Sequence, residues 1–447
     1  MGADLVRESA SAGRVVLWEE SARDGAQAKT LMGADFRVRL AREQGRIFGA
    51  DGPRHVVFAA GFPAVCAEEF EAVRRVAREA EGAVSVAAVC RATRDDVRQA
   101  VASVRGSAHA RVMVVAPASE AMARVMTHTG AAGALAAAVD LVKAARDQDD
   151  AVALDVCFAD ASRADHGLMG RYAAETTAAG ARVVVLADTV GEQLPQQVEE
   201  MFTAVRSAAG ADTVLASHLH NDLGLGLANT LGALRAGVRV LSSAWLGLAE
   251  RSGMVATEQL LFLLAYRADR TRELLGLGAA GAAGMASAGA AGVAGAGAPV
   301  GVGVGGDGGG PWWTEPDLTR LPGIARMVSD ETGVPLTVTT PIVGSGVGSI
   351  STGTPFVHPE LFQPFDPERL LGLEPQVVPT QLASARVVTA VAARLGHTLD
   401  AGQARAAMAW VKTRAFRTGR AVVDEAAFAA YLDGLLHGSA DATGAAS

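Results

Sequence analysis

Cysteine and aromatic residues are scarce in this chain of 447 residues. The three cysteines, Cys66, Cys90 and Cys157, are an odd number, and none of them lies in a C-x-x-C spacing. This pattern argues against a disulfide framework or a cysteine zinc site, and we expect buried thiols in a reducing compartment. Because aromatic residues make up only 5% of the chain, Ala and Val must provide much of the packed core.

Blocks of positive charge and long runs of strongly apolar residues are also absent. The formal net charge is −8 at pH 7, which argues against nucleic acid or an anionic membrane as a partner. The N-terminal residues lack the apolar core of a signal peptide. One long uncharged run, residues 274–306, consists mostly of Gly and Ala, and we interpret it as a flexible linker rather than a membrane span. We therefore expect a soluble, cytoplasmic protein.

Short apolar runs rich in Val alternate with longer amphipathic stretches through the first part of the chain. Each run is typical of a buried strand, and a helical pattern follows each one. Eight such units occupy about the length that is typical of a (β/α)8 barrel. An open doubly wound sheet is the alternative, but the Gly-rich phosphate loop that usually follows its first strand is missing. The predicted strands are 14–19, 55–60, 84–90, 110–116, 151–158, 182–187, 212–218 and 238–243.

The sequence thus predicts an α/β protein in two parts. Residues 1–275 form a (β/α)8 TIM barrel, and residues 276–310 form a flexible linker rich in Gly and Ala. Residues 311–437 form a smaller, mainly helical C-terminal region, and residues 438–447 form a tail.

Polar and charged residues gather directly after the predicted strands. In a parallel barrel the loops that follow the strands all lie on one face, and functional groups are found there. We therefore expect these residues to line a single site. They include Arg23 and Asp24 after the first strand, Asp160 and Arg163 after the fifth, Thr189 after the sixth, and His218 and His220 after the seventh.

The two histidines at the end of the seventh strand suggest a metal site. Residues i and i+2 of an extended chain point to the same face, so His218 and His220 can both point into the mouth of the barrel. Paired imidazoles are good ligands for divalent metals, and Asp24 is our candidate for the third ligand. The alternative is that the histidines only cap the strand through hydrogen bonds.

At these positions the chain resembles the family of isopropylmalate, homocitrate and citramalate synthases. Three segments match its motifs in order: ARDGAQ (22–27), HLHNDLGLGLAN (218–229) and GLAERSGMVATE (247–258). The resemblance implies a metal-dependent acyltransferase on a (β/α)8 barrel, which condenses acetyl-CoA with an α-keto acid in a Claisen-type reaction and then hydrolyses the thioester. It also implies a homodimer or a higher homo-oligomer.

The resemblance also implies a role for each candidate residue. Asp24, His218 and His220 would hold the divalent metal, Mn, Mg, Co or Zn, which polarises the keto carbonyl. Arg23 would neutralise the negative charge that forms on the carbonyl oxygen, and Thr189 would bind the substrate carboxylate. Arg163 is expected to bind a distal anionic group of the substrate. The alternative roles are an Arg23–Asp24 ion pair, a helix cap at Thr189 and a solvated charge at Arg163.

Several positions depart from the family motifs. The family's carboxylates in the second strand and after the fifth strand are replaced by Ala59 and Ala159, and its Asn after the eighth strand is Met254. The Asp-Thr-Thr of the first strand is replaced by Glu19-Glu20-Ser21. The general base that deprotonates the acetyl group therefore has three candidates: Asp160, His358 and a hydroxide on the metal.

The lost carboxylates favour a highly anionic keto acid as the substrate. Candidates are oxaloacetate, phosphonopyruvate and phosphinopyruvate, and the last would make the chain similar to a phosphinomethylmalate synthase of antibiotic biosynthesis. Two other functions stay open. One is a metal-dependent lyase or aldolase of the hydroxymethylglutaryl-CoA lyase type, and the other is a catalytically inactive regulatory relative.

Overall fold

The computed structural model describes residues 4–28, 30–274 and 310–437. These residues fall into two compact units, one drawn from Met1–Asp317 and Ile324–Pro335 and the other from Leu318–Gly323 and Leu336–Ser447. The predicted linker, except for Gly310, and the predicted tail lie outside the described residues.

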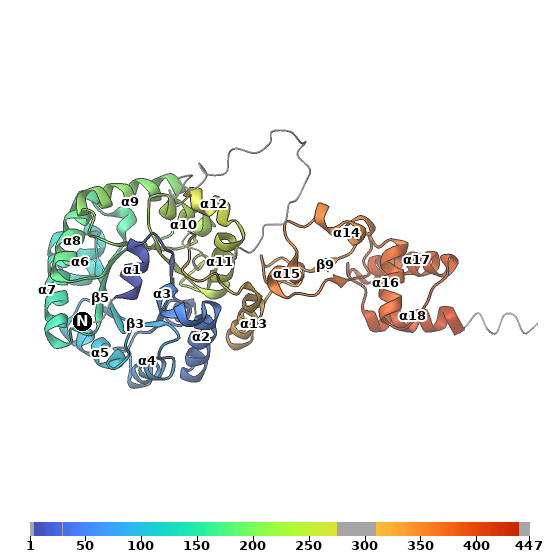
Figure 1. The fold of residues 1–447 in the computed structure, drawn as a ribbon, viewed down its shortest axis with the longest axis horizontal. Coiled ribbons are helices and arrows are strands. Elements are labelled where there is room, and N and C mark those ends of the chain that lie inside the picture. Colours follow the sequence, from blue (N-terminus) through green and yellow to red (C-terminus); the bar gives the residue numbers. More distant parts are fainter. Residues whose placement is uncertain (1–3, 29, 275–309, 438–447) are drawn as a thin grey trace, which may run out of the picture. The chain divides into compact units, whose positions relative to one another are not determined.

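Eight parallel strands form a closed barrel in the first unit, each paired with its neighbours in chain order and β1 paired with β8 (Figure 1). This confirms the (β/α)8 prediction, and the strands begin within three residues of their predicted starts. The apolar, β-branched runs form strands because both faces of each strand are covered, one by the barrel interior and one by helices. The strands are β1 (Val16–Glu19), β2 (Val56–Gly61), β3 (Ser85–Arg91), β4 (Arg111–Pro117), β5 (Ala153–Ala159), β6 (Val183–Asp188), β7 (Leu215–Leu219) and β8 (Val240–Ser243).

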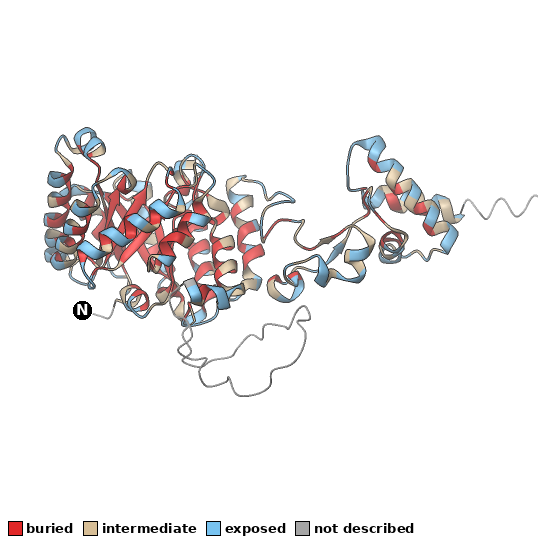
Figure 2. Cartoon of the chain, turned by 90° about the horizontal axis from the view of Figure 1, so that it is seen from above, coloured by how far each residue is buried: buried red, intermediate tan, exposed pale blue. Residues whose placement is uncertain are grey.

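Helices surround the barrel, and their buried sides face the strands (Figures 1 and 2). Small side chains allow close packing: a Cβ at Gly170 of α8 would lie 2.3 Å from Ala208 Cβ of α9. The outer helices are α2 (Ala34–Ile47), α3 (Gly52–His55), α4 (Ala67–Glu79), α5 (Arg94–Val104), α6 (Glu120–Thr127), α7 (Ala131–Gln148), α8 (His166–Ala179), α9 (Pro195–Ala209), α10 (Gly226–Arg235), α11 (Thr257–Tyr266) and α12 (Ala268–Leu274).

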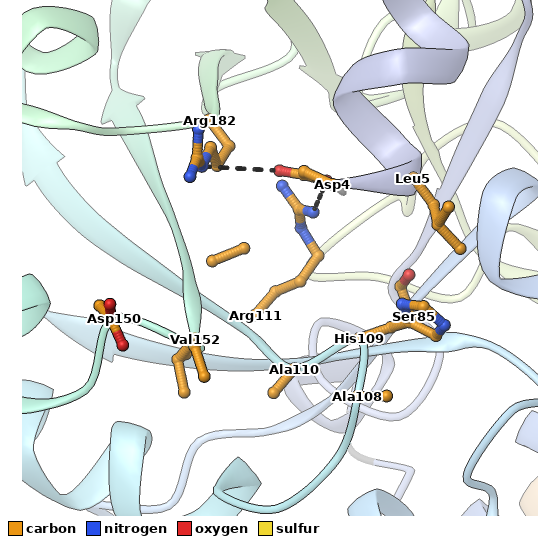
Figure 3. Close-up of a pocket in the computed structure, with 12 residues that line it drawn as sticks. Asp4, Leu5, Ser85, Ala108, His109, Ala110, Arg111, Asp150, Val152 and Arg182 are labelled. Carbon is orange, nitrogen blue, oxygen red and sulfur yellow. Dashed lines mark hydrogen bonds and ion pairs between the residues drawn. The ribbon is translucent and has the colours of Figure 1, made fainter. Parts of the chain in front are cut away.

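The N-terminal end of the barrel is closed by α1 (Leu5–Ser11) and a buried ion-pair network. Val6 and Ala10 of α1 pack against the residues that fill the barrel interior. Just beside them, Arg111 Nη2 lies 2.7 Å from Asp155 Oδ1, and Arg111 Nη1 lies 2.6 Å from Asp4 Oδ1. Asp4 and Arg111 line a cavity of about 60 Å³ (Figure 3). Because Arg111 is satisfied by two carboxylates, we assign this end of the barrel a structural role.

The second unit is mainly helical, as predicted. Its core contains Val391, Val411 and Phe428, and the rings of Trp410 and Tyr431 stack with their centroids 4.4 Å apart. Helix α13 (Leu321–Thr332) is shared between the two units. The other elements are β9 (Ser349–Ile350), α14 (Gly353–Val357), α15 (Pro367–Leu371), β10 (Gln376–Val377), α16 (Ala385–Arg394), α17 (Ala401–Thr418) and α18 (Glu425–His437).

In the part of the chain that the structure describes, no single helix has the length and hydropathy needed to cross a membrane. Helices α6 and α7 meet that criterion only as a pair, and the pair is bent by 64°.

Candidate active site

Asp24, His218 and His220 converge at the C-terminal end of the barrel. His218 Nε2 lies 3.2 Å from Asp24 Oδ2 and 3.3 Å from His220 Nε2. His220 Nε2 lies 3.9 Å from the same oxygen of Asp24. All three side chains are buried. Within the described residues they form the one cluster of three or more side chains with the spacing of metal ligands.

The geometry of this triad fits a divalent cation. A triangle with these three edges has a point about 2.0 Å from each ligand atom, which is close to the usual length of metal–nitrogen and metal–oxygen bonds. Two imidazoles and one carboxylate also suit Zn, Mn or Co. The triad would therefore supply three protein ligands to a cation and would leave further coordination positions for a substrate.

The turn after β1 presents Asp24 to the two histidines. The backbone N–H groups of Asp24 and Gly25 both donate to the Glu20 carbonyl oxygen, at 2.7 and 3.1 Å. On the other side, the Glu250 N–H donates to Asp24 Oδ1 at 3.0 Å, so Oδ2 is the oxygen that faces the imidazoles. One carboxylate oxygen is thus used for positioning, and the other is directed toward the triad.

The loop after β8 holds the backbone around His220. The Asn221 N–H donates to the Gly253 carbonyl oxygen at 2.8 Å, and the His220 N–H donates to that of Asp188 at 3.3 Å. Gly253 has a φ of 84°, and a Cβ at this position would lie 2.0 Å from the Gly247 carbonyl oxygen. Glycine is therefore required at this position of the ERSG segment, because the backbone at Gly247 leaves no room for a side chain.

Arg23 is held between two carboxylates at the floor of the site. Its Nε and Nη2 donate to Glu20 at 2.9 and 3.2 Å, and its Nη1 lies 3.2 Å from Asp24 Oδ2. The Arg23–Asp24 ion pair, which the sequence offered as the alternative role of Arg23, therefore forms, but the two-point contact is with Glu20. Sequence reasoning assigned no function to Glu20. The available signal was a carboxylate at a position where the family motif has Thr.

The pKa shifts favour positive charge on His218 and a neutral ring at His220. Burial raises the pKa of Asp24, but Arg23 and the imidazoles outweigh burial and hold it well below its usual range. Burial lowers the pKa of His218, but its hydrogen bonds and ionic contacts with Asp24 and Glu20 outweigh burial and raise it to about 9. Burial and the charge on His218 lower the pKa of His220 to about 4. Two buried carboxylates thus stabilise a cationic centre between the strands.

Asp160, Arg163 and Thr189 form a second polar group on the same face of the barrel. Arg163 Nε donates to Asp160 Oδ1 at 2.8 Å, and the Ser119 hydroxyl donates to Asp160 Oδ2. The Asp160 N–H donates to Thr189 Oγ1 at 2.8 Å. Asp160 has a φ of 61°, a strained value that the surrounding hydrogen bonds maintain. Both oxygens of its buried carboxylate are occupied, whereas the Arg163 side chain is 48% exposed.

His358 lies in the second compact unit, between α14 and the 3-10 turn Pro359–Leu361. Its Nδ1 is 3.2 Å from Glu360 Oε1, and its side chain is exposed. The remaining candidates, Arg23, Asp24, Asp160, Arg163, Thr189, His218 and His220, all belong to the barrel unit.

The sequence model of the HMGL-like family matches residues 14–275, which is more than half of the chain. The chain belongs to the HMGL-like family. Curated relatives include the 2-isopropylmalate synthases of Pelotomaculum thermopropionicum and Neisseria gonorrhoeae. The first is 33% identical over 262 residues, which are 58% of this chain and 50% of that protein. The second is 32% identical over 267 residues, which are 59% of this chain and 43% of that protein.

These relatives confirm the resemblance to the isopropylmalate synthases that the motifs predict. The chain spans about half the length of the curated relatives it matches. Among solved structures, a hydroxymethylglutaryl-CoA lyase of Bacillus subtilis is 17% identical with a TM-score of 0.52, and the match covers 72% of this chain and 95% of that one. A lyase of Acinetobacter baumannii, solved with coenzyme A and 3-methylmalate, is 19% identical with a TM-score of 0.51, covering 72% and 92%. Both likenesses support the fold.

Proposed function

We propose that this protein is a metal-dependent acyltransferase that condenses acetyl-CoA with an α-keto acid and releases a malate-type dicarboxylic acid. The observation that carries the proposal is the convergence of Asp24, His218 and His220 on one buried point, directly beside Arg23. Relatives named 2-isopropylmalate synthase support the reaction class. We also propose that the protein acts in the cytoplasm and that it forms a homodimer or a higher homo-oligomer.

Asp24, His218 and His220 are the proposed ligands of a divalent metal. Bound there, the metal supplies a Lewis acid for the keto carbonyl. Arg23 places a fixed positive charge beside the oxygen that gains negative charge during carbon–carbon bond formation. Because Glu20 and Asp24 already hold the guanidinium in place, Arg23 needs little reorganisation in the transition state. Thr189 is proposed to bind the substrate carboxylate.

The proposed substrates are keto acids with a second anionic group, such as oxaloacetate, phosphonopyruvate or phosphinopyruvate. Ala59 and Ala159 are small and uncharged where the family has carboxylates, so they add no repulsion toward an anion. Arg163 supports this assignment, because Asp160 engages its Nε while about half of the side chain remains accessible. A phosphinopyruvate substrate would correspond to a role in antibiotic biosynthesis.

Asp160 and His358 are the proposed candidates for the general base among the side chains. Asp160 lies on the barrel face with the triad but would have to release Ser119 or Arg163 before accepting a proton. His358 is exposed, and its Nδ1 lies 3.2 Å from Glu360 Oε1, so its imidazole is open to solvent. Separate Asp160→Asn and His358→Gln variants distinguish them, because only the base variant should lose acetyl-methyl proton exchange while retaining metal.

A metal-dependent lyase of the hydroxymethylglutaryl-CoA type is the second candidate function. The HMGL-like match and the lyase fold support it, since condensation and cleavage can share one metal-bound oxyanion chemistry. The ERSG segment after β8 favours the synthase, because the motif that it resembles belongs to the condensing enzymes.

The test is product analysis by mass spectrometry. The purified protein is incubated with acetyl-CoA and a panel of keto acids, before and after chelation, and separately with hydroxymethylglutaryl-CoA. We expect a metal-dependent condensation product, with the dianionic keto acids preferred over 2-oxoisovalerate. Cleavage of hydroxymethylglutaryl-CoA without condensation would support the lyase, and strong preference for 2-oxoisovalerate would overturn the substrate assignment.

A further inference from the structure

Glu20 is a buried acid at the floor of the site that belongs neither to the metal triad nor to the family motif. It directly follows β1, and its side chain is completely buried. A buried carboxylate is unfavourable unless charged partners and hydrogen bonds compensate for its lost hydration. Its partners therefore indicate what this carboxylate does.

The first partner is Arg23. Glu20 Oε2 accepts from Arg23 Nε at 2.9 Å, and Glu20 Oε1 accepts from Nη2 at 3.2 Å. Two parallel contacts fix the plane of a guanidinium as well as its position. The remaining terminal nitrogen, Nη1, is then directed to Asp24, 3.2 Å away. Glu20 thus determines that Nη1 is the nitrogen of Arg23 that points toward the triad.

The second partner is His218. Glu20 Oε1 lies 3.4 Å from His218 Nδ1, a buried nitrogen that has no shorter hydrogen bond within the described residues. The other ring nitrogen, Nε2, faces Asp24 and His220. A histidine with one nitrogen toward a ligand cluster and the other toward a carboxylate has a fixed ring orientation and a more basic ligand atom.

We infer that Glu20 is a positioning residue that couples Arg23 to the metal ligand His218, so that one carboxylate orients both. The inference rests on the proposed metal-dependent function. It also explains the exchange of charges around the site. Ala59 of β2 and Ala159 at the end of β5 stand where the family motifs have carboxylates. Glu20, in contrast, places a carboxylate next to the triad where the motif has Thr. Relative to the family motifs, a carboxylate is thus present next to the metal ligands, at Glu20, and absent at Ala59 and Ala159.

The test is metal titration of the full-length, metal-free protein with Co²⁺, followed by calorimetry and by the visible absorption of the bound ion. Glu20→Gln keeps the size of the side chain and removes its charge, and Glu20→Thr introduces the residue type of the family motif. We expect both variants to bind Co²⁺ at least about tenfold more weakly than the parent, with altered absorption bands. With the best keto acid, kcat should fall more than KM rises.

Glu69→Gln is the matched control. Glu69 also makes a two-point ion pair with a buried arginine, Arg37, at 2.8 Å for both contacts, but it does not touch the triad. We expect its Co²⁺ affinity to stay within twofold of the parent. Circular dichroism establishes that each variant is folded, and if Glu20→Gln unfolds, Glu20→Thr decides the question.

Two outcomes separate this inference from the proposed function. If the parent binds Co²⁺ and a folded Glu20→Thr variant binds it with equal affinity and the same spectrum, Glu20 does not position His218, while the proposed function stands. If the parent itself binds no Co²⁺, the metal-dependent function is overturned and the role of Glu20 with it.

Discussion

At the scale of single residues, one carboxylate oxygen connects the two ends of the barrel sequence. Asp24 follows the first strand, and its Oδ2 lies close to the imidazoles of His218 and His220 at the end of the seventh strand. The spacing of the two histidines and the strand-end rule were sufficient to predict this meeting. They could not predict Glu20, because its importance depends on which side chains surround it after the barrel closes, and no periodicity in the sequence encodes that.

Replacing Asp24 tests the triad directly. We expect Asp24→Asn to lose stoichiometric metal and to reduce kcat/KM by at least about 100-fold, because an amide oxygen is neutral and a weaker ligand. Metal content by elemental mass spectrometry and turnover give the two readouts. The control is Asp96→Asn, which removes a carboxylate that pairs with Arg91 at 2.6 Å and is not a member of the triad. Full metal content in folded Asp24→Asn would contradict the ligand assignment.

Arg163 should determine the preference for substrates with two anionic groups. We expect Arg163→Leu to raise KM for oxaloacetate or phosphonopyruvate by about 10- to 100-fold, the usual effect of a lost charged hydrogen bond, with little change for 2-oxoisovalerate. Arg163→Lys should recover part of the loss, because it keeps the charge but not the fork of donors.

The matched control for Arg163→Leu is Arg98→Leu on α5, where the arginine side chain is 68% exposed and pairs with Asp95 on the same helix. Equal KM increases for substrates with and without the distal charge would show that Arg163 supports the loop rather than the substrate.

At the scale of elements, the barrel strands were predictable because Val-rich runs suit strands covered on both faces. The return of the chain after the predicted linker was not predictable. The Val15 N–H donates to the Pro311 carbonyl oxygen at 2.8 Å, and the Trp313 N–H donates to His55 Nε2 at 2.9 Å. This docking depends on one imidazole and a pair of tryptophans, and neither has the periodicity of a helix or a strand.

His55 makes this docking sensitive to acid. Its Nε2 accepts from Trp313, so Nδ1 carries the proton that is donated to the Val15 carbonyl oxygen at 2.8 Å, and the ring is neutral. Burial, only partly offset by the Val15 contact, lowers the pKa of His55 from 6.5 to about 4. The unfolded chain therefore binds more protons than the folded chain between these values, and the free energy of unfolding falls as the pH decreases through this window.

The full effect on the free energy of unfolding is about 3 kcal/mol, reached near pH 4. Urea titrations of the parent and of His55→Gln between pH 7 and pH 4 measure this effect. The quantity to follow is the difference between the free energies of unfolding of the two proteins at each pH. We expect His55→Gln to be less stable at pH 7 and to lose less stability on acidification. Parallel pH profiles for the two proteins would exclude His55 as the source.

At the scale of the whole molecule, the compact unit that contains the barrel does not stop where the strand–helix pattern stops. The pattern ends near residue 275, but the unit includes residues up to Asp317 and again from Ile324 to Pro335. Trp312, Ile324 and Val328 are buried there. Sequence patterns locate a repeated fold well, but they do not reveal which later segment completes its surface, since that depends on complementary shapes.

Two truncated chains test whether the segment after the strand–helix pattern stabilises the barrel. A chain that ends at residue 335 retains every segment of the barrel unit, whereas one that ends at residue 275 loses the cover provided by Trp312 and exposes His55 and Phe48, whose rings it contacts. Burying one large apolar side chain stabilises a protein by about 2–3 kcal/mol, so we expect the shorter chain to melt about 5–10 °C lower. Calorimetry at equal concentration measures the difference. Equal melting temperatures would mean that the returning segment does not stabilise the barrel. Residue 275 would then be the end of the stable unit as well as the end of the strand–helix pattern.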